Sequence, residues 1–227
     1  MKLPFKPHAI LFDLDGTLAD TAADLAAPVN AMRLERGLPA MPLDDLRPYA
    51  SMGARGLLKK GLGVEKESPE FEPLRIDFLQ RYEAAMMVET RLFDGFDGES
   101  GVLAQLKTQG IAWGVVSNKV ERYVRPILKE LGVTDDSVCI VGGDTSGFAK
   151  PHPEPLLYGC RFANLDPTKC VYVGDDLRDI EAGKAAGMIT IAAAYGFCGA
   201  SEPLHWGAHY ILNSPSDLLL LLSSERT

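Results

Sequence analysis

Short apolar runs alternate along most of the chain with longer stretches in which apolar residues recur every three or four positions. An uninterrupted apolar run is typical of a strand covered on both faces, and the intervening periodicity is typical of helices. The expected strands are Ala9–Asp13, Ala112–Ser117, Ser137–Val141, Cys170–Gly174, Thr190–Ala194 and His209–Leu212. The expected helices between them are Ser100–Gln109, Lys119–Leu131, Glu154–Asn164 and Arg178–Ala186. The alternation predicts an α/β fold with a doubly wound parallel sheet.

One long segment departs from this alternation. Between about Leu18 and Arg91 no strand is expected, and the periodicity is helical throughout. The expected helices are Asp24–Arg36, Ala54–Leu62 and Phe71–Met87, the first with an apolar face formed by Leu25, Val29, Met32 and Leu34. The pattern predicts an all-helical cap domain, residues 18–91, inserted after the first strand of a core formed by residues 1–17 and 92–227. Leu92–Gly98 is rich in turn residues and is expected to be the return hinge.

Proline adds two expectations to this outline. Pro126 lies inside the expected helix Lys119–Leu131, which it should kink or split. Ser214 and Pro215 precede the leucine run Leu218–Leu222, and a serine followed by proline is a common helix start. The run is far too short to span a membrane, so it is expected to form a docked C-terminal helix.

The charge balance restricts the possible partners. Among 227 residues, 23 Lys and Arg oppose 31 Asp and Glu, and the formal net charge is −8. A negative field argues against sequence-independent binding to nucleic acid or to an anionic membrane. It does not exclude a small anionic substrate, because a metal ion or a local basic cluster can invert the sign inside a pocket.

The four cysteines indicate a reducing environment. Cys139, Cys160, Cys170 and Cys198 form no CxxC pair and have no histidine at zinc-like spacing. They are expected to be buried free thiols, as in cytoplasmic proteins. The apolar stretch before Asp13 is too short for the core of a signal peptide, so the expected location is the cytoplasm.

Candidate chemistry begins directly after the first strand. Asp13 and Asp15 are two residues apart, so their side chains leave the strand on the same side, and Gly16 follows. The carboxyl edge of an open α/β sheet is where ligands bind. The alternative is an ordinary Asp-Gly turn with solvated carboxylates.

Two more strand ends carry polar groups that suit an anion. Ser117 and Asn118 end the second core strand with a hydroxyl and exposed backbone N–H groups, although either residue could simply cap the next helix. Lys150 precedes two prolines that restrict the backbone, although a single lysine is usually a solvated surface charge.

A third acidic cluster follows the strand Cys170–Gly174. Asp175, Asp176 and Asp179 lie within five residues, and such carboxylates repel one another unless a cation compensates. Oxygen ligands of this kind suit a hard metal ion. The order of the segments predicts one site at the carboxyl edge of the sheet, with an acidic pair, a hydroxyl, a lysine and a second acidic cluster.

These four segments, in this order and with the helical insertion between the first two, resemble the signature motifs of the haloacid dehalogenase-like superfamily in its phosphatase branch. The resemblance implies that Asp13 is the nucleophile and that Asp15 protonates the leaving oxygen and then activates water. It implies a Mg²⁺ ion on Asp13, Asp175 and the backbone carbonyl of Asp15, although the ligand types do not distinguish Mg²⁺ from Mn²⁺. Ser117, Asn118 and Lys150 would hold the phosphate oxygens.

Supporting roles follow from the same resemblance. Asp179 is expected to orient Lys150 or a metal-bound water, Thr17 to support the carboxylates, and Asp20 to start the first cap helix. The role of Asp176 stays open, since many relatives carry serine there. In the cap, Ser51, Gly53 and Arg55 are expected to contact the substrate, with Arg55 binding an anion; the alternative is a helix start capped by Ser51 with Arg55 in solvent.

The substrate is expected to be a small anionic phosphomonoester. The chain resembles the phosphoglycolate phosphatases and also the N-acetylmuramic acid 6-phosphate phosphatases. It has Phe93-Asp94-Gly95 where phosphoglycolate enzymes commonly have Tyr-Pro-Gly. A phosphoglucomutase-type phosphotransferase shares the motifs and remains an alternative. Asp15 argues against a dehalogenase, and the helical insertion argues against a response-regulator receiver. Monomer and homodimer both stay open.

Overall fold

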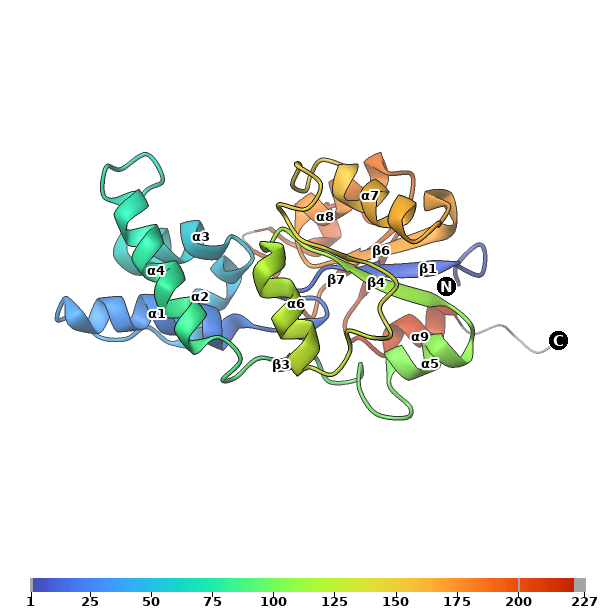
Figure 1. Cartoon of the computed structure of the whole chain (residues 1–227), viewed down its shortest axis with the longest axis horizontal. Coiled ribbons are helices and arrows are strands. Elements are labelled where there is room, and N and C mark those ends of the chain that lie inside the picture. Colours follow the sequence, from blue (N-terminus) through green and yellow to red (C-terminus); the bar gives the residue numbers. More distant parts are fainter. Residues whose placement is uncertain (1, 200, 223–227) are drawn as a thin grey trace.

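The computed structural model describes residues 2–199 and 201–222 and contains a six-stranded, fully parallel sheet. The strands lie in the order β5-β4-β1-β6-β7-β8, with β1 near the middle (Figure 1). Their bounds are β1 Ala9–Phe12, β4 Ala112–Val116, β5 Ile140–Val141, β6 Cys170–Gly174, β7 Ile189–Ala193 and β8 Tyr210–Leu212. All six predicted strands are confirmed, and the predicted parallel α/β fold with them. The largest error in length is at β5, which begins three residues later than expected.

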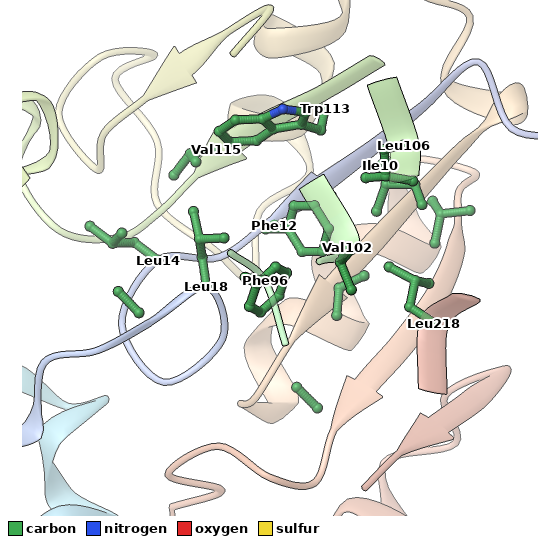
Figure 2. Packing of buried hydrophobic residues seen from close by; sticks show 14 of the residues in the cluster. Ile10, Phe12, Leu14, Leu18, Phe96, Val102, Leu106, Trp113, Val115 and Leu218 are labelled. Atoms are coloured by element: carbon green, nitrogen blue, oxygen red, sulfur yellow. The ribbon is translucent and has the colours of Figure 1, made fainter. Parts of the chain in front are cut away.

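Helices cover both faces of the sheet, as the apolar strands require. Ile10 and Phe12 of β1 pack on one side against α5 (Val102–Thr108), α6 (Glu121–Glu130) and α9 (Asp217–Leu222). Ala9 and Leu11 point to the other side, toward α7 (Glu154–Phe162) and α8 (Leu177–Ala185). Figure 2 shows the first of these clusters, in which the rings of Phe12 and Phe96 meet edge to face at 5.4 Å between centroids. The side chains of β1 therefore alternate between two packed faces.

Pro126 was predicted to kink or split its helix, and the split is wrong. The helix α6 runs without a break through Pro126. Proline removes one backbone hydrogen bond, but Tyr123, Val124, Ile127 and Leu128 are all buried along one side of α6. Packing of that face offsets the missing bond.

The leucine run near the C-terminus forms the docked helix that was predicted. In α9, Leu218 is buried in the apolar cluster that also contains Ile10 and Phe12 of β1. The helix starts at Asp217, two residues after Pro215, and the Asp217 carboxylate accepts hydrogen bonds from the backbone N–H groups of Asn213 and Ser214. Among residues 2–199 and 201–222, no helix combines the length and apolar character needed to cross a membrane.

All four cysteines are free thiols, as predicted. Cys139, Cys160 and Cys170 are buried between the sheet and α7, whereas Cys198 is only partly buried, so the expectation of burial is wrong for that residue. Burial raises the pKa of the Cys139 thiol to about 12, and this thiol therefore stays protonated at neutral pH.

Four helices form the segment between the first two core strands. They are α1 Ala22–Glu35, α2 Leu43–Ala50, α3 Gly53–Leu62 and α4 Phe71–Ala85, and they pack on one another around a separate apolar cluster. In Figure 1 these helices lie on the left of the view, beyond one end of the strands. The helix α2 was not among the expected helices, because it contains Pro48 and buries only Leu46 and Ala50. Leu34 was expected on the apolar face of α1 but is 60% exposed.

Two short strands connect the helical segment to the sheet. Ala19–Asp20 (β2) pairs antiparallel with Arg91–Leu92 (β3). The expectation of no strand between Leu18 and Arg91 is therefore wrong at both ends, since two-residue strands have no readable periodicity. Asp20 accepts a hydrogen bond from the N–H of Ala22 at the start of α1, as expected, and also pairs with Arg47 at 2.8 Å. The domain boundaries at 17/18 and 91/92 stay a prediction.

The buried carboxylate of Asp24 joins the start of α1 to the chain that leaves α4. Asp24 in α1 is 3% exposed and accepts hydrogen bonds from the backbone N–H groups of Met87, Glu89 and Thr90, each at 3.0 Å. The Thr90 hydroxyl donates a fourth bond, at 2.7 Å. The chain leaving α4 is thus attached to the start of α1, directly before β3.

We expect Asp24→Ala to lower the free energy of unfolding by about 2 kcal/mol, because several backbone donors lose an ionised acceptor at once. Urea denaturation followed by circular dichroism measures this loss. The control is Asp77→Ala, which removes a carboxylate that is only partly buried and pairs with Arg81, and which should change stability by less than about 0.5 kcal/mol. Equal effects of the two substitutions would contradict a special role for Asp24.

Candidate active site

The carboxyl ends of β1, β4, β5 and β6 and the helical segment enclose a cavity of about 260 Å³. Core residues predicted from the sequence line it together: Asp13, Asp15, Ser117, Asn118, Lys150, Asp176 and Asp179. Ser51 and Gly53 line it from the helical segment. Parallel strands end at one edge, and this is why residues from distant parts of the chain meet there.

An acidic cluster forms the floor of this site. Asp13, Asp175 and Asp179 each offer an oxygen within 4.8 Å of the other two. Asp175 is fully buried; its carboxylate accepts hydrogen bonds from Thr17 Oγ1 at 3.1 Å and from the N–H of Phe197 at 2.8 Å. Burial, together with the charges of Asp13 and Asp179, raises the pKa of Asp175 well above its usual range. Crowded oxygen ligands fit a hard divalent cation, which would relieve this repulsion.

Gly16 lets the chain turn directly over that cluster. Its φ of 84° lies in the left-handed region, and a Cβ there would overlap the Asp175 carboxylate. Any other residue would displace Asp175 or the turn, so the glycine after Asp15 is a requirement of the packing.

Lys150 is a buried cation, not a solvated surface charge. Its Nζ lies 2.7 Å from Asp179 and 3.1 Å from Asp13, and it donates to Tyr172 Oη and to the carbonyl of Val116. Burial alone would lower the pKa of Lys150, but the two carboxylates outweigh it and raise the pKa. Burial raises the pKa of Asp179 to about 6, against the opposing effect of Lys150. The ammonium is therefore held between the two carboxylates.

Asn118 fixes the backbone at Lys150. The N–H of Lys150 donates to Asn118 Oδ1 at 2.8 Å, and Asn118 Nδ2 donates to the Lys150 carbonyl at 3.0 Å. Ser117 is buried, and its hydroxyl accepts a bond from the N–H of Lys119. The alternative that Ser117 or Asn118 caps the following helix is wrong, because Val120 is the N-cap of α6 and the first N–H of that helix, at Glu121, donates to Asp144 instead.

Asp176 caps α8. Its carboxylate accepts a hydrogen bond from the N–H of Arg178 at 2.9 Å, while Asp179 accepts one from the N–H of Asp176. Burial would raise the pKa of Asp176, but Arg178 lowers it overall. Arg178 also donates to the carbonyl of Ser51 at 2.9 Å and so joins the core to the helical segment. Arg178 was not predicted as a site residue. Its position two residues after Asp176, where it can pair with that carboxylate, is a usable signal.

Lys119 is the second residue that sequence reasoning missed. Its Nζ lies 2.9 and 3.1 Å from the two carboxylate oxygens of Asp15, and Thr21 Oγ1 donates to Asp15 at 2.6 Å. The ammonium also lies 4.8 Å from the centre of the Tyr82 ring. Nothing in the sequence distinguishes this lysine from an exposed one before a helix; it is buried because α4 packs over it.

The helical segment contributes differently from what was predicted. The alternative in which Ser51 caps α3 is wrong, because Met52 is the N-cap and no side chain caps that helix. Arg55 is exposed, and it is not one of the described residues that line the cavity. The prediction that Arg55 binds a substrate anion stays a prediction.

Comparison with known proteins agrees with this geometry. The model of the family described as haloacid dehalogenase-like hydrolase matches residues 10–193, which include the acidic pair, Ser117, Lys150 and the second acidic cluster. The chain belongs to the haloacid dehalogenase-like hydrolases. The resemblance stated from the motifs is confirmed.

Similar members of this hydrolase family are named for two different substrates. The chain is 42% identical over 215 residues to an N-acetylmuramic acid 6-phosphate phosphatase of Pseudomonas aeruginosa, covering 94% of each chain. It is 44% identical over 213 residues to a phosphoglycolate phosphatase of Xanthomonas campestris pv. campestris, covering 93% of this chain and 95% of that one. A crystal structure of a predicted phosphoglycolate phosphatase from Haemophilus somnus 129PT superposes with a TM-score of 0.83 at 27% identity, covering 97% of this chain and all of that one.

Proposed function

We propose that this hydrolase removes phosphate from a small-molecule phosphomonoester through an aspartyl-phosphate intermediate, as a phosphoglycolate phosphatase-like enzyme. The observation that carries the proposal is the position of Asp13 in the cavity, beside a buried ammonium and a cluster of carboxylates. An anionic ester needs positive charge around it, and the nucleophile must lie within reach of the phosphorus.

Asp13 is the proposed nucleophile. The N–H of Leu14 donates to Asp13 Oδ1 at 2.7 Å, and Lys150 Nζ also lies against Oδ1. Both contacts leave Oδ2 as the oxygen for attack. A bond forms between Oδ2 and phosphorus while the bond to the leaving alcohol oxygen breaks. Water then displaces Asp13 from the phosphorus and releases inorganic phosphate.

Asp15 is the proposed acid and base. It delivers a proton to the alcohol oxygen in the first step and takes one from water in the second. Thr21 and Lys119 hold its carboxylate from two directions. Ser117, Asn118 and Lys150 are proposed to bind the remaining phosphate oxygens, the last through its ammonium.

Asp13, Asp175 and the backbone carbonyl of Asp15 are proposed to hold Mg²⁺. The ion supplies positive charge that offsets the acidic cluster and the phosphate. We expect chelation with EDTA to abolish phosphate release and added Mg²⁺ to restore it. The same titration should raise the thermal unfolding midpoint, since a cation that binds only the folded state stabilises it. Full activity in EDTA would contradict the metal assignment.

N-acetylmuramic acid 6-phosphate is the second candidate substrate. The cavity has apolar walls from Leu25, Phe78 and Leu79, which a two-carbon acid does not need, and a 42% identical relative has this specificity in its name. Turnover of both compounds by the same preparation, with Mg²⁺, decides between them. Release of inorganic phosphate, with no isomeric sugar phosphate formed, would exclude the phosphoglucomutase-type alternative.

A further inference from the structure

The carboxylate of Asp15 is held by two donors from distant parts of the chain. Thr21 Oγ1, directly before α1, donates to Oδ1 at 2.6 Å, and Lys119 Nζ lies 2.9 Å from Oδ1 and 3.1 Å from Oδ2. Thr21 is fully buried, and the side chains of Lys119 and Asp15 are 8% and 14% exposed. Charge-assisted hydrogen bonds away from bulk water are short and strong, so these two donors restrict the orientation of Asp15.

A tyrosine of the helical segment supports the Lys119 ammonium. Tyr82 in α4 is 2% exposed, and Lys119 Nζ lies 4.8 Å from the centre of its ring. Tyr123 of α6 packs edge to face against the same ring, with 5.6 Å between centroids. An aromatic ring attracts a cation and at the same time excludes water from it. The lysine therefore has a defined position, which it transmits to Asp15.

Two buried ammonium groups line the cavity, and they contact different carboxylates. Lys150 Nζ lies 3.1 Å from Asp13, the proposed nucleophile, whereas Lys119 Nζ lies 2.9 Å from Asp15. Asp15 has to act twice, first on the alcohol oxygen and then on a water oxygen. A carboxylate that rotates freely is aligned with either oxygen only part of the time, and restricting its orientation accelerates both proton transfers.

We propose that Lys119 is a positioning residue: its ammonium, supported by the Tyr82 ring, fixes the Asp15 carboxylate for both proton transfers. This inference rests on the proposed phosphatase function. In the first step the bond between Asp13 and phosphorus forms, the bond to the alcohol oxygen breaks, and the proton of Asp15 goes to that oxygen. In the second step the oxygen of water attacks phosphorus, its proton goes to Asp15, and the bond between Asp13 and phosphorus breaks. Lys119 acts on both steps through Asp15.

Acetyl phosphate separates the two proton transfers. Its leaving group is acetate, which is ionised at neutral pH and departs without a proton, so the first step does not need Asp15. The second step still does. An alcohol ester, phosphoglycolate or N-acetylmuramic acid 6-phosphate, needs Asp15 in both steps. Rapid acid quenching followed by mass spectrometry of the peptide that contains Asp13 measures how fast the phosphoryl group is gained and lost.

For Lys119→Met we expect the first step with acetyl phosphate to stay within about 3-fold of the wild-type rate and the second step to slow about 100-fold. Phosphorylated Asp13 should therefore accumulate. With the alcohol ester that the wild-type enzyme hydrolyses faster, kcat should fall about 100-fold and KM should stay within about 3-fold, because binding is unchanged. Here the first step is slow as well, so phosphorylated Asp13 should not accumulate beyond the wild-type level.

A second variant and a matched control accompany this test. Thr21→Val removes the other donor to Asp15 with little change of shape, and it should give the same pattern with a loss of about 10-fold. The control is Lys60→Met. Lys60 also lies over a tyrosine ring, 5.3 Å from the centre of Tyr49, but it is not one of the described residues that line the cavity. This variant should leave every rate within about 2-fold of the wild type.

Each contrary result has a distinct meaning. If Lys119→Met slows the first step with acetyl phosphate as much as the second, the proposal is overturned, since a lysine that binds the transferring phosphate or only supports the fold would do this. A wild-type kcat for the alcohol ester would overturn it too. If circular dichroism shows that Lys119→Met does not fold, Thr21→Val decides, and unchanged rates in that variant would contradict the positioning of Asp15. A wild-type enzyme that never carries phosphate on Asp13 would instead contradict the proposed function.

Discussion

The Asp13→Asn variant is expected to lose at least about 10⁴-fold in kcat while it keeps its fold. Asparagine has the shape of aspartate, but its amide oxygen carries no negative charge with which to attack phosphorus. The fold should survive, because the substitution removes a charge from a crowded acidic cluster and Lys150 keeps its contact with Asp179. Phosphate release measures turnover, and circular dichroism measures the unfolding midpoint.

A direct observation of the intermediate completes this test. Wild-type enzyme quenched in acid during turnover should carry one phosphoryl group on the peptide that contains Asp13, and the variant should carry none. The control is Asp176→Asn, since Asp176 also lines the cavity but serves as the cap of α8, a position that asparagine fills equally well. That variant should lose no more than about 10-fold. Wild-type turnover in Asp13→Asn would eliminate the covalent mechanism.

The core of the fold could be predicted because burial leaves a clear mark on the sequence. β1 and β6 are covered on both faces, so they appear as uninterrupted apolar runs, and the observed bounds differ by at most one residue. The helix α2 buries only two residues and contains a proline, and its pattern is therefore weak. The two-residue strands β2 and β3 exist only because the ends of the inserted segment meet, and no local signal announces that.

The residues of the candidate site also divide into those that the sequence predicted and those that it did not. Residues that follow strands, such as Asp13, Ser117 and Asp175, were placed together because the carboxyl ends of parallel strands share one edge. Lys119 and Tyr82 were missed because they meet only when α4 lies over the start of α6. Arg55, whose predicted role is untested, is exposed and is not among the described residues that line the cavity. The helix α3 buries Gly56, Leu57, Leu58 and Gly61 and leaves Arg55 exposed.

Replacing Lys150 with methionine is expected to lower kcat/KM about 10³-fold and the free energy of unfolding by about 3 kcal/mol. Methionine retains much of the length of the side chain but removes the ammonium that lies between Asp13 and Asp179. Two carboxylates then face each other beside the buried Asp175 without the ammonium that lay between them. Phosphate release and urea denaturation measure the two losses. The control is Lys107→Met at an exposed lysine, which should alter neither value measurably.

The double variant Lys150→Met, Asp179→Asn separates charge balance from phosphate binding. Asparagine at position 179 can still accept the hydrogen bond from the N–H of Asp176, so the cap of α8 is preserved. Removing one of the opposed carboxylates should recover most of the lost stability, because the cost of the single change lies in uncompensated buried charge. Turnover should stay low, since no ammonium remains to bind a phosphate oxygen. Recovery of both stability and turnover would mean that Lys150 acts only by holding the carboxylates, and that the phosphate is bound by other groups.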